Sequence, residues 1–480
     1  MDALLLQSGV AMARMVRARE ITSVELVERH IAQIERVNPT LNAMVHQRFD
    51  QARAEAQAAD ARTAAEDPAA LPPFHGVPCS IKECFALTGM RNTSGLSARR
   101  EVVADFDATA VARYRRAGAI PLGVTNVPEL CMWMETSNKV YGRTNNPYNP
   151  RRIVGGSSGG EGAIIASAGA PFGLGSDIGG SIRMPAFFNG VFGHKATGGL
   201  VPGTGQYPLA ANEALRYLTT GPLAKRAEDI WPLLKILAGP DGQDAGCVEW
   251  KLGDPASVEI GKLSVVSIEG IPGKPVCEDL LSAQRKVVKH LAGLGAQVKT
   301  VALPELKDSF HIWSSMLAAA NGPSFTEMMA QGKPYKGWRE LLRLAGGQSP
   351  HTLPAVVLTL LERLNSPARI QRFAAKGRAL RERMVEMIGP DGILLFPSHP
   401  YPAPPHDKPL YRPFNWVYTA ILNVMEIPVT QTPLGLDRDG IPLGVQVAAT
   451  HGNDHLTVAV ALELEKAFGG WTPPTFNYLS

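Results

Sequence analysis

Residues 155–197 read GGSSGGEGAIIASAGAPFGLGSDIGGSIRMPAFFNGVFGHKAT, and the rest of the chain is best interpreted outward from this stretch. It is rich in glycine, yet apolar helix-like runs lie between the glycines, unlike in a low-complexity linker. Two serines lie in glycine settings, Ser157 after Gly155-Gly156 and Ser181 after Gly179-Gly180. Glycines beside a serine let several backbone N–H groups converge on one point. Such donors stabilise the oxyanion that forms when a serine attacks a carbonyl group.

A lysine directly follows an apolar run upstream of these serines. Val77–Ile81 is suited to a buried strand, and Lys82 comes next. A lysine amine acts as a base when it is uncharged, and burial favours the uncharged form. The adjacent Glu83 would hold the amine charged, but alternation along a strand places it on the opposite face. Lys82 is therefore a candidate base for one of the two serines.

Short apolar runs alternate with helical patterns over most of the chain, which predicts an α/β sheet. Six runs are predicted to be strands: Val77–Ile81, Ala119–Val124, Leu263–Ser267, Gln297–Val301, Ile393–Phe396 and Val445–Ala448. Helices are predicted from a Thr22/Glu25 capping box to Asn38-Pro39, over Gln51–Glu66 and Ala108–Ala117, after Pro128, over Glu278–Leu294 and over His455–Phe468.

The domain organisation is predicted to be a single unit over residues 1–480, since the sequence contains no internal repeat and no flexible linker. Within it we expect N-terminal helices over 1–70 and a catalytic core over 71–304. A mostly helical inserted region is expected over 305–390, and C-terminal core strands with a closing helix over 391–480.

Composition excludes several classes of protein. The net charge of +4 is too small for a nucleic-acid groove. Five scattered cysteines argue against a disulfide framework and favour a reducing compartment, so a cytoplasmic location is expected. The first residues lack the pattern of a signal peptide, and no apolar run reaches the length of a membrane span. His451 and His455 have helical spacing but no accompanying Glu, so no metal site is predicted, and no cofactor motif is present.

The quoted stretch closely resembles the signature motif of the amidase-signature family. The resemblance extends to Gly76-Val77-Pro78 through Lys82-Glu83 and to Gly440–Gln446 near the C-terminus. Glu129–Trp133, Arg183–Gly190 and Phe396–Pro400 are most similar to the fatty-acid amide hydrolase 2 branch of the family. One departure is Lys195-Ala196-Thr197, where the family has Lys-Pro-Thr.

The resemblance implies a fold and a set of catalytic residues. The expected fold is a large, mixed, twisted β-sheet covered by α-helices on both faces, with an inserted helical substrate-channel region. The expected triad is Ser181 as nucleophile, Ser157 as bridging serine after a cis peptide bond, and Lys82 as base. The implied oxyanion donors are the N–H groups of Ile178, Gly179, Gly180 and Ser181, with structural support from Ser158, Asp177 and Arg183.

The implied activity is hydrolysis of hydrophobic carboxylic amides, such as fatty-acyl or aryl amides, through an acyl-serine intermediate. An apolar channel is expected from Met132, Trp133, Phe187 and Phe188, with further large apolar side chains in the inserted region, among them Trp313 and Met316. No cofactor, metal, nucleic acid or membrane span is expected, and the protein is predicted to be a monomer or a homodimer.

Other interpretations of the same residues remain open at this stage. The same triad could hydrolyse carbamates or esters, or serve as the amidase subunit of a tRNA-dependent amidotransferase, although Gly198–Gly203 departs from the segment expected there. Gly155–Gly159 also fits the G-x-S-x-G elbow of α/β hydrolases, with Ser157 as nucleophile. That interpretation leaves Lys82 and Ser181 without a role. A phosphate-binding loop is disfavoured because neither glycine cluster matches a known phosphate motif.

Overall fold

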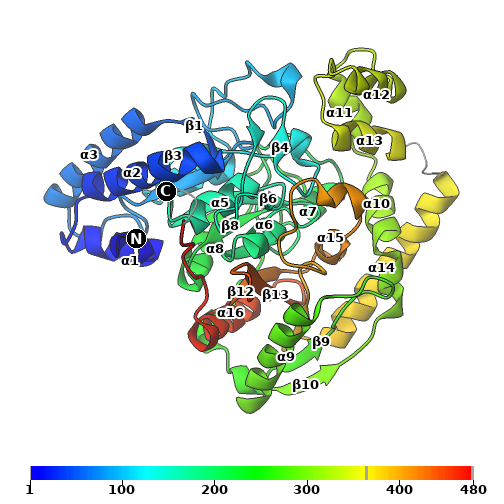
Figure 1. Cartoon of the computed structure of the whole chain (residues 1–480). Helices are drawn as coiled ribbons and strands as arrows, with labels where there is room; N and C mark the ends of the chain where they lie inside the picture. The colour runs from blue at the N-terminus through cyan, green and yellow to red at the C-terminus, as the bar shows by residue number, and fades with distance from the viewer. Residues whose placement is uncertain (1, 363–365, 477–480) are drawn as a thin grey trace.

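One large sheet forms the centre of the molecule (Figure 1). The computed structural model describes residues 2–362 and 366–476. The sheet has eleven strands in the order β1-β3-β2-β6-β8-β7-β12-β13-β11-β9-β10, and β4 and β5 form a separate short hairpin. The bounds are β1 Met44–Gln47, β2 Pro78–Lys82, β3 Ile120–Thr125, β4 Ser137–Asn138, β5 Gly142–Arg143, β6 Phe172–Asp177, β7 Phe192–Lys195, β8 Thr219–Ala224, β9 Ser264–Ser267, β10 Gln297–Thr300, β11 Gly392–Phe396, β12 Val429–Leu436 and β13 Pro442–Ala449.

The sheet is mixed, as predicted. Strand β2 runs parallel to β3 and β6, and β9 runs parallel to β10 and β11. The other neighbouring pairs in the sheet are antiparallel. All six predicted strands are present, because each is a short run of strand-forming residues bounded by turn residues. Five of them are mostly buried, whereas β10 at the sheet edge is largely exposed. The predicted α/β class is confirmed.

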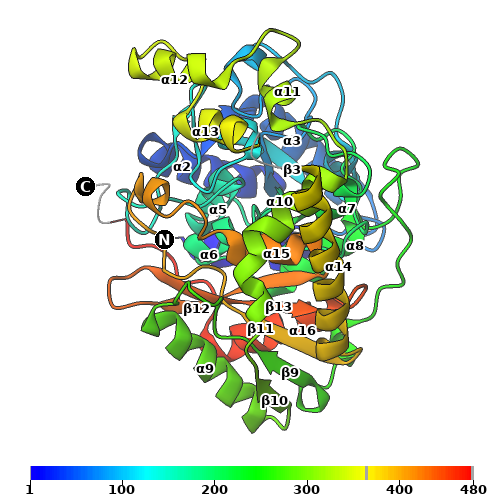
Figure 2. The same cartoon turned by 90° about the vertical axis from the view of Figure 1, so that its right-hand side faces the viewer.

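Helices cover both faces of the sheet (Figures 1 and 2). Side chains that alternate along one strand enter different cores: Val265 packs with α9 and α16, whereas its neighbour Val266 packs with α10, α14 and α15. The helices are α1 Gly9–Arg17, α2 Ser23–Leu41, α3 Phe49–Ala65, α4 Thr109–Arg116, α5 Gly159–Ala166, α6 Arg183–Phe188, α7 Ala214–Tyr217, α8 Ile230–Leu237, α9 Glu278–Gly293, α10 Ser309–Ala319, α11 Phe325–Ala330, α12 Gly337–Ala345, α13 Leu353–Glu362, α14 Pro367–Ile388, α15 Val417–Val424 and α16 Asp454–Phe468.

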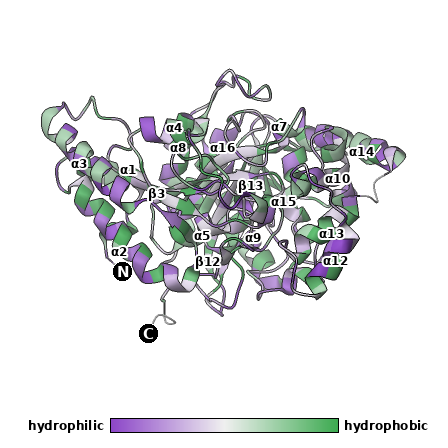
Figure 3. Cartoon of the chain, turned by 90° about the horizontal axis from the view of Figure 1, so that it is seen from above, coloured by the Kyte–Doolittle hydropathy of each residue, from purple (hydrophilic) through white to green (hydrophobic). Residues whose placement is uncertain are grey.

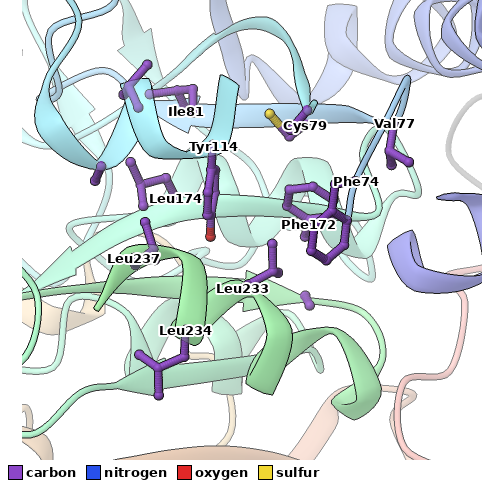
Figure 4. Close-up of a cluster of buried hydrophobic side chains, with 14 of the residues drawn as sticks. Phe74, Val77, Cys79, Ile81, Tyr114, Phe172, Leu174, Leu233, Leu234 and Leu237 are labelled. Carbon is purple, nitrogen blue, oxygen red and sulfur yellow. The ribbon is translucent and has the colours of Figure 1, made fainter. Parts of the chain in front are cut away.

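An aromatic cluster fixes the strands that carry the signature residues (Figure 4). The ring of Phe172 on β6 makes edge contacts with Phe74 (centroids 4.9 Å apart) and with Tyr114 of α4 (5.7 Å). Leu233 and Leu237 of α8 close the cluster on the other side. Full burial of one such side chain contributes roughly 1.5–3 kcal/mol, so the cluster holds β2 and β6 firmly beside each other.

The region predicted to be inserted, residues 305–390, contains helices α10 to α14. Helices α10 and α14 pack on the sheet core, whereas α11, α12 and α13 project from it as a small group (Figures 1 and 2). Helix α12 carries both hydrophobic and hydrophilic residues, whereas α13 is mostly hydrophobic (Figure 3), and Trp338 and Leu342 of α12 stay exposed.

Several local predictions near the N-terminus are wrong. Helix α2 does not stop at Asn38-Pro39 but continues to Leu41, because the Asn38 carboxamide accepts from Ala43 and Met44 N–H and secures the last turn. The capping box is half formed, since Thr22 accepts from the Glu25 N–H while the Glu25 carboxylate binds Arg29. The N-terminal segment supplies the edge strand β1 as well as helices.

The segment after Pro128 also differs from the prediction. The predicted helix is a single 3-10 turn over Glu129–Cys131, because Leu130 and Cys131 take left-handed backbone conformations, with φ of 52° and 58°. A hydrogen bond from Leu130 N to Ser94 O (2.7 Å) anchors this turn, and Met132 and Trp133 follow it.

Candidate active site

Lys82 ends strand β2 with its amine fully buried. Its Nζ lies 2.7 Å from Ser157 Oγ, 3.0 Å from Ser176 Oγ and 3.3 Å from Ser176 O. Within residues 2–362 and 366–476, Lys82 forms no ion pair. The amine is thus surrounded by hydroxyl and carbonyl oxygens rather than by a carboxylate. The structure therefore brings the predicted base into direct contact with the predicted bridging serine.

Glu83 points to the other face of the strand, as alternation predicts. Its carboxylate accepts from Thr93 N–H and Oγ (2.7 and 2.6 Å), Ser94 N–H (2.8 Å) and Tyr141 OH (2.8 Å). Burial raises the pKa of Glu83 to about 7, although these four donors oppose the shift. Glu83 therefore organises the 93–94 turn and does not pair with Lys82.

A backbone hydrogen bond joins the segments that carry Ser157 and Ser181. The Gly156–Ser157 peptide bond is cis, and the Ser158 N–H donates to Ser181 O at 3.0 Å. Position 156 has to be glycine, because a Cβ there would lie 2.1 Å from Trp133 O. Ser181 lines a cavity together with Gly156 and is 8% exposed. The two serine segments and the lysine thus meet at one end of β2 and β6.

Residues 177–181, called the nucleophile loop here because they carry the predicted nucleophile Ser181, have every carbonyl oxygen bonded. Two of the bonds come from the backbone: Met184 N–H to Gly180 O (2.8 Å) and Ser158 N–H to Ser181 O (3.0 Å). Three come from side chains: Asn423 Nδ2 to Asp177 O (2.8 Å), Trp313 Nε1 to Ile178 O (2.8 Å) and Thr419 Oγ to Gly179 O (2.9 Å). The loop is therefore held from its carbonyl side.

The N–H groups of the same loop divide into two sets. Gly180 donates to Asp177 Oδ1 at 2.6 Å, so this predicted oxyanion donor is already used inside the loop. The N–H groups of Ile178, Gly179 and Ser181 have no hydrogen-bond acceptor among the residues that the structure describes, and all three residues line the cavity. Gly180 has a φ of 109°, and a Cβ there would collide with Thr419 Oγ at 1.9 Å.

Asp177 and Arg183 form a fully buried bidentate ion pair with both bonds at 3.0 Å. Burial acts to raise the pKa of Asp177, but the Arg183 guanidinium outweighs it and holds that pKa well below its usual range. Arg183 also donates to Gln446 Oε1 (2.7 Å) and Asn423 Oδ1 (2.6 Å). The pair thus braces the nucleophile loop against the C-terminal strands.

The cavity is lined mainly by apolar groups and has about 440 Å³ of free space, part of it open to solvent. Met132 and Trp133 line it, as predicted, and Met134, Met184, Leu358 and Trp416 join them. Phe187 and Phe188, predicted to line the channel, are not among the residues that line this cavity, although they belong to the same apolar cluster as Met134 and Met184. They lie at the far end of α6, where they pack with Ile441 and Leu443 in the core.

Cys131 is a cavity residue that the sequence analysis missed. It lines the cavity beside Ser181, and its Sγ lies 3.7 Å from Ser94 Oγ. Burial acts to raise the pKa of Cys131, but hydrogen bonds from Cys84, Ser94 and Ser157 and the charge of Lys82 together outweigh it, and the pKa falls to about 6. A spacing signal could not have found this residue, because its position follows from the left-handed turn after Pro128.

We expect iodoacetamide at pH 7 to alkylate Cys131 and to remove most of the activity, because the added group fills the cavity next to Ser181. The half-buried Cys277, whose pKa is raised by burial, should react later. Peptide mass spectrometry and residual activity measure both events, with Cys131→Ser as the protected control. Full activity of an enzyme alkylated at Cys131 would contradict this placement.

Comparisons with known proteins agree with the geometry. A family model described as Amidase matches residues 25–458. Fatty-acid amide hydrolase 2 of Homo sapiens is 47% identical, over 98% of this chain and 91% of that protein. A glutamyl-tRNA(Gln) amidotransferase subunit from Neisseria meningitidis serogroup C (strain 053442) is 30% identical, over 91% of this chain and 92% of that protein. The structure of 6-aminohexanoate cyclic dimer hydrolase complexed with substrate superimposes with a TM-score of 0.82 at 27% identity, covering 98% of this chain and 99% of that one.

Proposed function

This chain belongs to the amidase family and is a hydrolase of amide C–N bonds; from that premise we propose that it cleaves hydrophobic carboxylic amides, of fatty-acyl or aryl type, through an acyl-Ser181 intermediate. The observation that carries the proposal is the buried Lys82 amine, 2.7 Å from Ser157 Oγ and without a carboxylate partner among the described residues. A buried lysine amine with no carboxylate to hold it charged can act as a general base.

The proposed relay begins at Lys82. In its uncharged form the amine has two protons and one lone pair. Ser176 O and Oγ, at 3.3 and 3.0 Å, can accept the two protons, which leaves the lone pair for the Ser157 hydroxyl. Ser157 passes its proton to Lys82 and takes one from Ser181 as Ser181 Oγ attacks the amide carbon.

The proposed oxyanion site consists of the free N–H groups of Ile178, Gly179 and Ser181. Each of these N–H groups shares a peptide group with a carbonyl oxygen that is already hydrogen-bonded. The donors therefore need little reorganisation when negative charge develops on the substrate oxygen. Each such donor is worth about 2.7–4 kcal/mol of barrier. The relay then runs backwards, the leaving nitrogen takes the proton, and water hydrolyses the acyl-Ser181 ester.

The substrate class follows from the cavity and from the relatives. Met132, Trp133, Met184 and Trp416 offer an apolar and adaptable wall beside Ser181. The 47% identical relative is named for fatty-acid amides, whereas the amidotransferase relative is 30% identical. Both observations favour a hydrophobic acyl group over the side chain of glutamine.

A substrate panel tests this proposal. We expect kcat/KM for acyl p-nitroanilides to rise by roughly threefold to fourfold per methylene over the first few carbons, because each buried CH₂ contributes about 0.8 kcal/mol. Release of p-nitroaniline is followed by absorbance, with the Ser181→Ala protein as blank. Matched p-nitrophenyl esters and aryl carbamates measure the preference among amide, ester and carbamate bonds. Activity confined to carbamates, or to glutamine in the presence of a second protein, would contradict the proposal.

The setting of the enzyme is a further part of the proposal. Over residues 2–362 and 366–476, no helix combines the length and the hydrophobicity that a bilayer-spanning segment needs. A cytoplasmic location is proposed from the thiol content, and all five cysteines are free. We also propose a monomer or homodimer that works without metal, cofactor or nucleic acid.

A further inference from the structure

The peptide group between Ile178 and Gly179 is held differently from its neighbours in the nucleophile loop. Its carbonyl oxygen accepts from Trp313 Nε1 at 2.8 Å, and its N–H has no protein acceptor in the described part of the chain. By contrast, the next peptide group is bonded at both edges, by Thr419 Oγ at Gly179 O and by Asp177 at the Gly180 N–H. One hydrogen bond from one indole thus fixes the first of these groups.

The planarity of the peptide group sets where the free N–H points. In a trans peptide the C=O and the N–H point in opposite directions. Trp313 bonds the carbonyl but is not part of the cavity wall, whereas Ile178 and Gly179 both line the cavity. The Trp313 bond therefore turns the carbonyl away from the cavity and the Gly179 N–H towards it.

On the Gly179 side, little else opposes rotation of this peptide group. Glycine at 179 removes the side chain that would restrict its backbone. A Cβ placed there would meet nothing nearer than the Trp313 and Trp416 rings, at 3.6 Å. If the group turned over, a carbonyl oxygen would face the substrate oxyanion, and the site would lose a donor and gain a repulsive dipole.

Trp313 is itself rigidly placed. It lies on α10, in the inserted helical region, and is 8% exposed. Its ring packs edge-on against Trp416, with centroids 4.7 Å apart and an interplanar angle of 78°. Trp416 lines the cavity, so this pair of rings links α10 both to the substrate space and to the nucleophile loop.

We propose that Trp313 is a positioning residue for amide hydrolysis: its indole N–H holds the Ile178–Gly179 peptide so that the Gly179 N–H faces the substrate oxyanion. The inference rests on the proposed function, in which Ser181 is the nucleophile. It assigns to the inserted helical region a part in transition-state stabilisation, in addition to shaping the channel.

The test removes the indole N–H and keeps an aromatic ring. In Trp313→Phe we expect kcat for an acyl p-nitroanilide to fall by roughly tenfold, less than the 10²–10³-fold loss of a whole donor, because the Gly179 N–H stays in place and loses only the bond that orients it. KM and the shape of the pH–rate profile should stay near native values, since neither the channel wall nor the relay is changed. The Ki of a trifluoromethyl ketone, which forms a tetrahedral adduct on the nucleophile, should rise by the same factor as kcat falls.

Two further variants separate this role from simple packing. Replacing Trp313 with 3-benzothienylalanine keeps the ring shape and removes the N–H, so it should reproduce the loss seen in Trp313→Phe. Trp250→Phe is the matched control: its indole N–H has no hydrogen-bond partner among the described residues, and it lies away from the cavity. Its kcat and Ki should equal those of the native enzyme.

Several outcomes would overturn the inference. Native kcat in the benzothienyl variant would do so, as would a loss that appears in KM alone or a loss of kcat with unchanged Ki. If the native enzyme forms no ketone adduct on Ser181, the proposed function fails and the inference fails with it. A native adduct combined with native Ki in both Trp313 variants rejects the role of Trp313 alone.

Discussion

Replacing Ser181 with alanine is expected to abolish amide hydrolysis, with kcat falling by a factor on the order of 10⁴ or more, the scale seen when a serine nucleophile is removed. Ser181 is the hydroxyl placed beside the free N–H groups of Ile178 and Gly179, at the wall of the apolar cavity. No other serine lines that cavity within the described residues. Release of p-nitroaniline under single-turnover conditions measures the loss.

The same variant decides between two nucleophiles. If the glycine segment around Ser157 were an α/β-hydrolase elbow, Ser157 would carry the acyl group and Ser181→Ala would keep most of its activity. Intact-mass spectrometry of enzyme quenched during turnover should show an acyl adduct in the native protein and none in the variant. A melting temperature within a few degrees of the native value would show that the fold is retained. An acyl group on Ser157 would contradict the assignment.

The sequence was sufficient for the α/β class and for six of the eleven strands of the large sheet, but it did not predict β1, β6, β7, β8 and β12, the strand order or local irregularities. Runs such as Val77–Ile81 and Ile393–Phe396 are strands because each is apolar, short and bounded by turn residues. The course of the chain after Pro128 was unpredictable, since the left-handed Leu130 and Cys131 depend on a bond to Ser94, over thirty residues away in the chain. Helix α2 continues past Pro39 for a similar reason, because the Asn38 side chain accepts hydrogen bonds from the backbone N–H groups of Ala43 and Met44.

Within the site, the resemblance to the family motif identified residues that the structure brings together. It did not predict which hydrogen bonds these residues form or which distant segments contact them. Lys82 and Ser157, both named from the motif, lie in direct contact. The use of the Gly180 N–H by Asp177 could not be foreseen, because a Gly-Gly-Ser sequence does not say which N–H is already bonded. Trp313 was visible as a large side chain in the inserted region, yet its bond to Ile178 joins positions far apart in the chain.

Replacing Lys82 with methionine is expected to lower kcat/KM by roughly 10²–10⁴-fold at neutral pH, the usual contribution of a positioned proton acceptor. The substitution keeps the length and burial of the side chain and removes the nitrogen that contacts Ser157 at 2.7 Å. Hydroxide can partly replace the lost base, so kcat/KM of the variant should rise about tenfold per pH unit between pH 7 and 9. Initial rates over that range measure both effects.

Lys82→Arg separates proton transfer from charge at the same position. A guanidinium keeps a positive group near Ser157 but cannot be deprotonated in a protein, so it cannot accept the serine proton. If Lys82 acts as a base, the arginine variant should be as inactive as the methionine variant. If instead a fixed positive charge at this position supports the transition state, arginine should restore most of the rate. The neighbouring carboxylate of Glu83 is bonded to Thr93, Ser94 and Tyr141 on the opposite face. It would therefore not neutralise the arginine at position 82, and the two variants can be compared directly. Recovery of activity in Lys82→Arg would therefore reject the relay and leave Ser181 to be activated by another group.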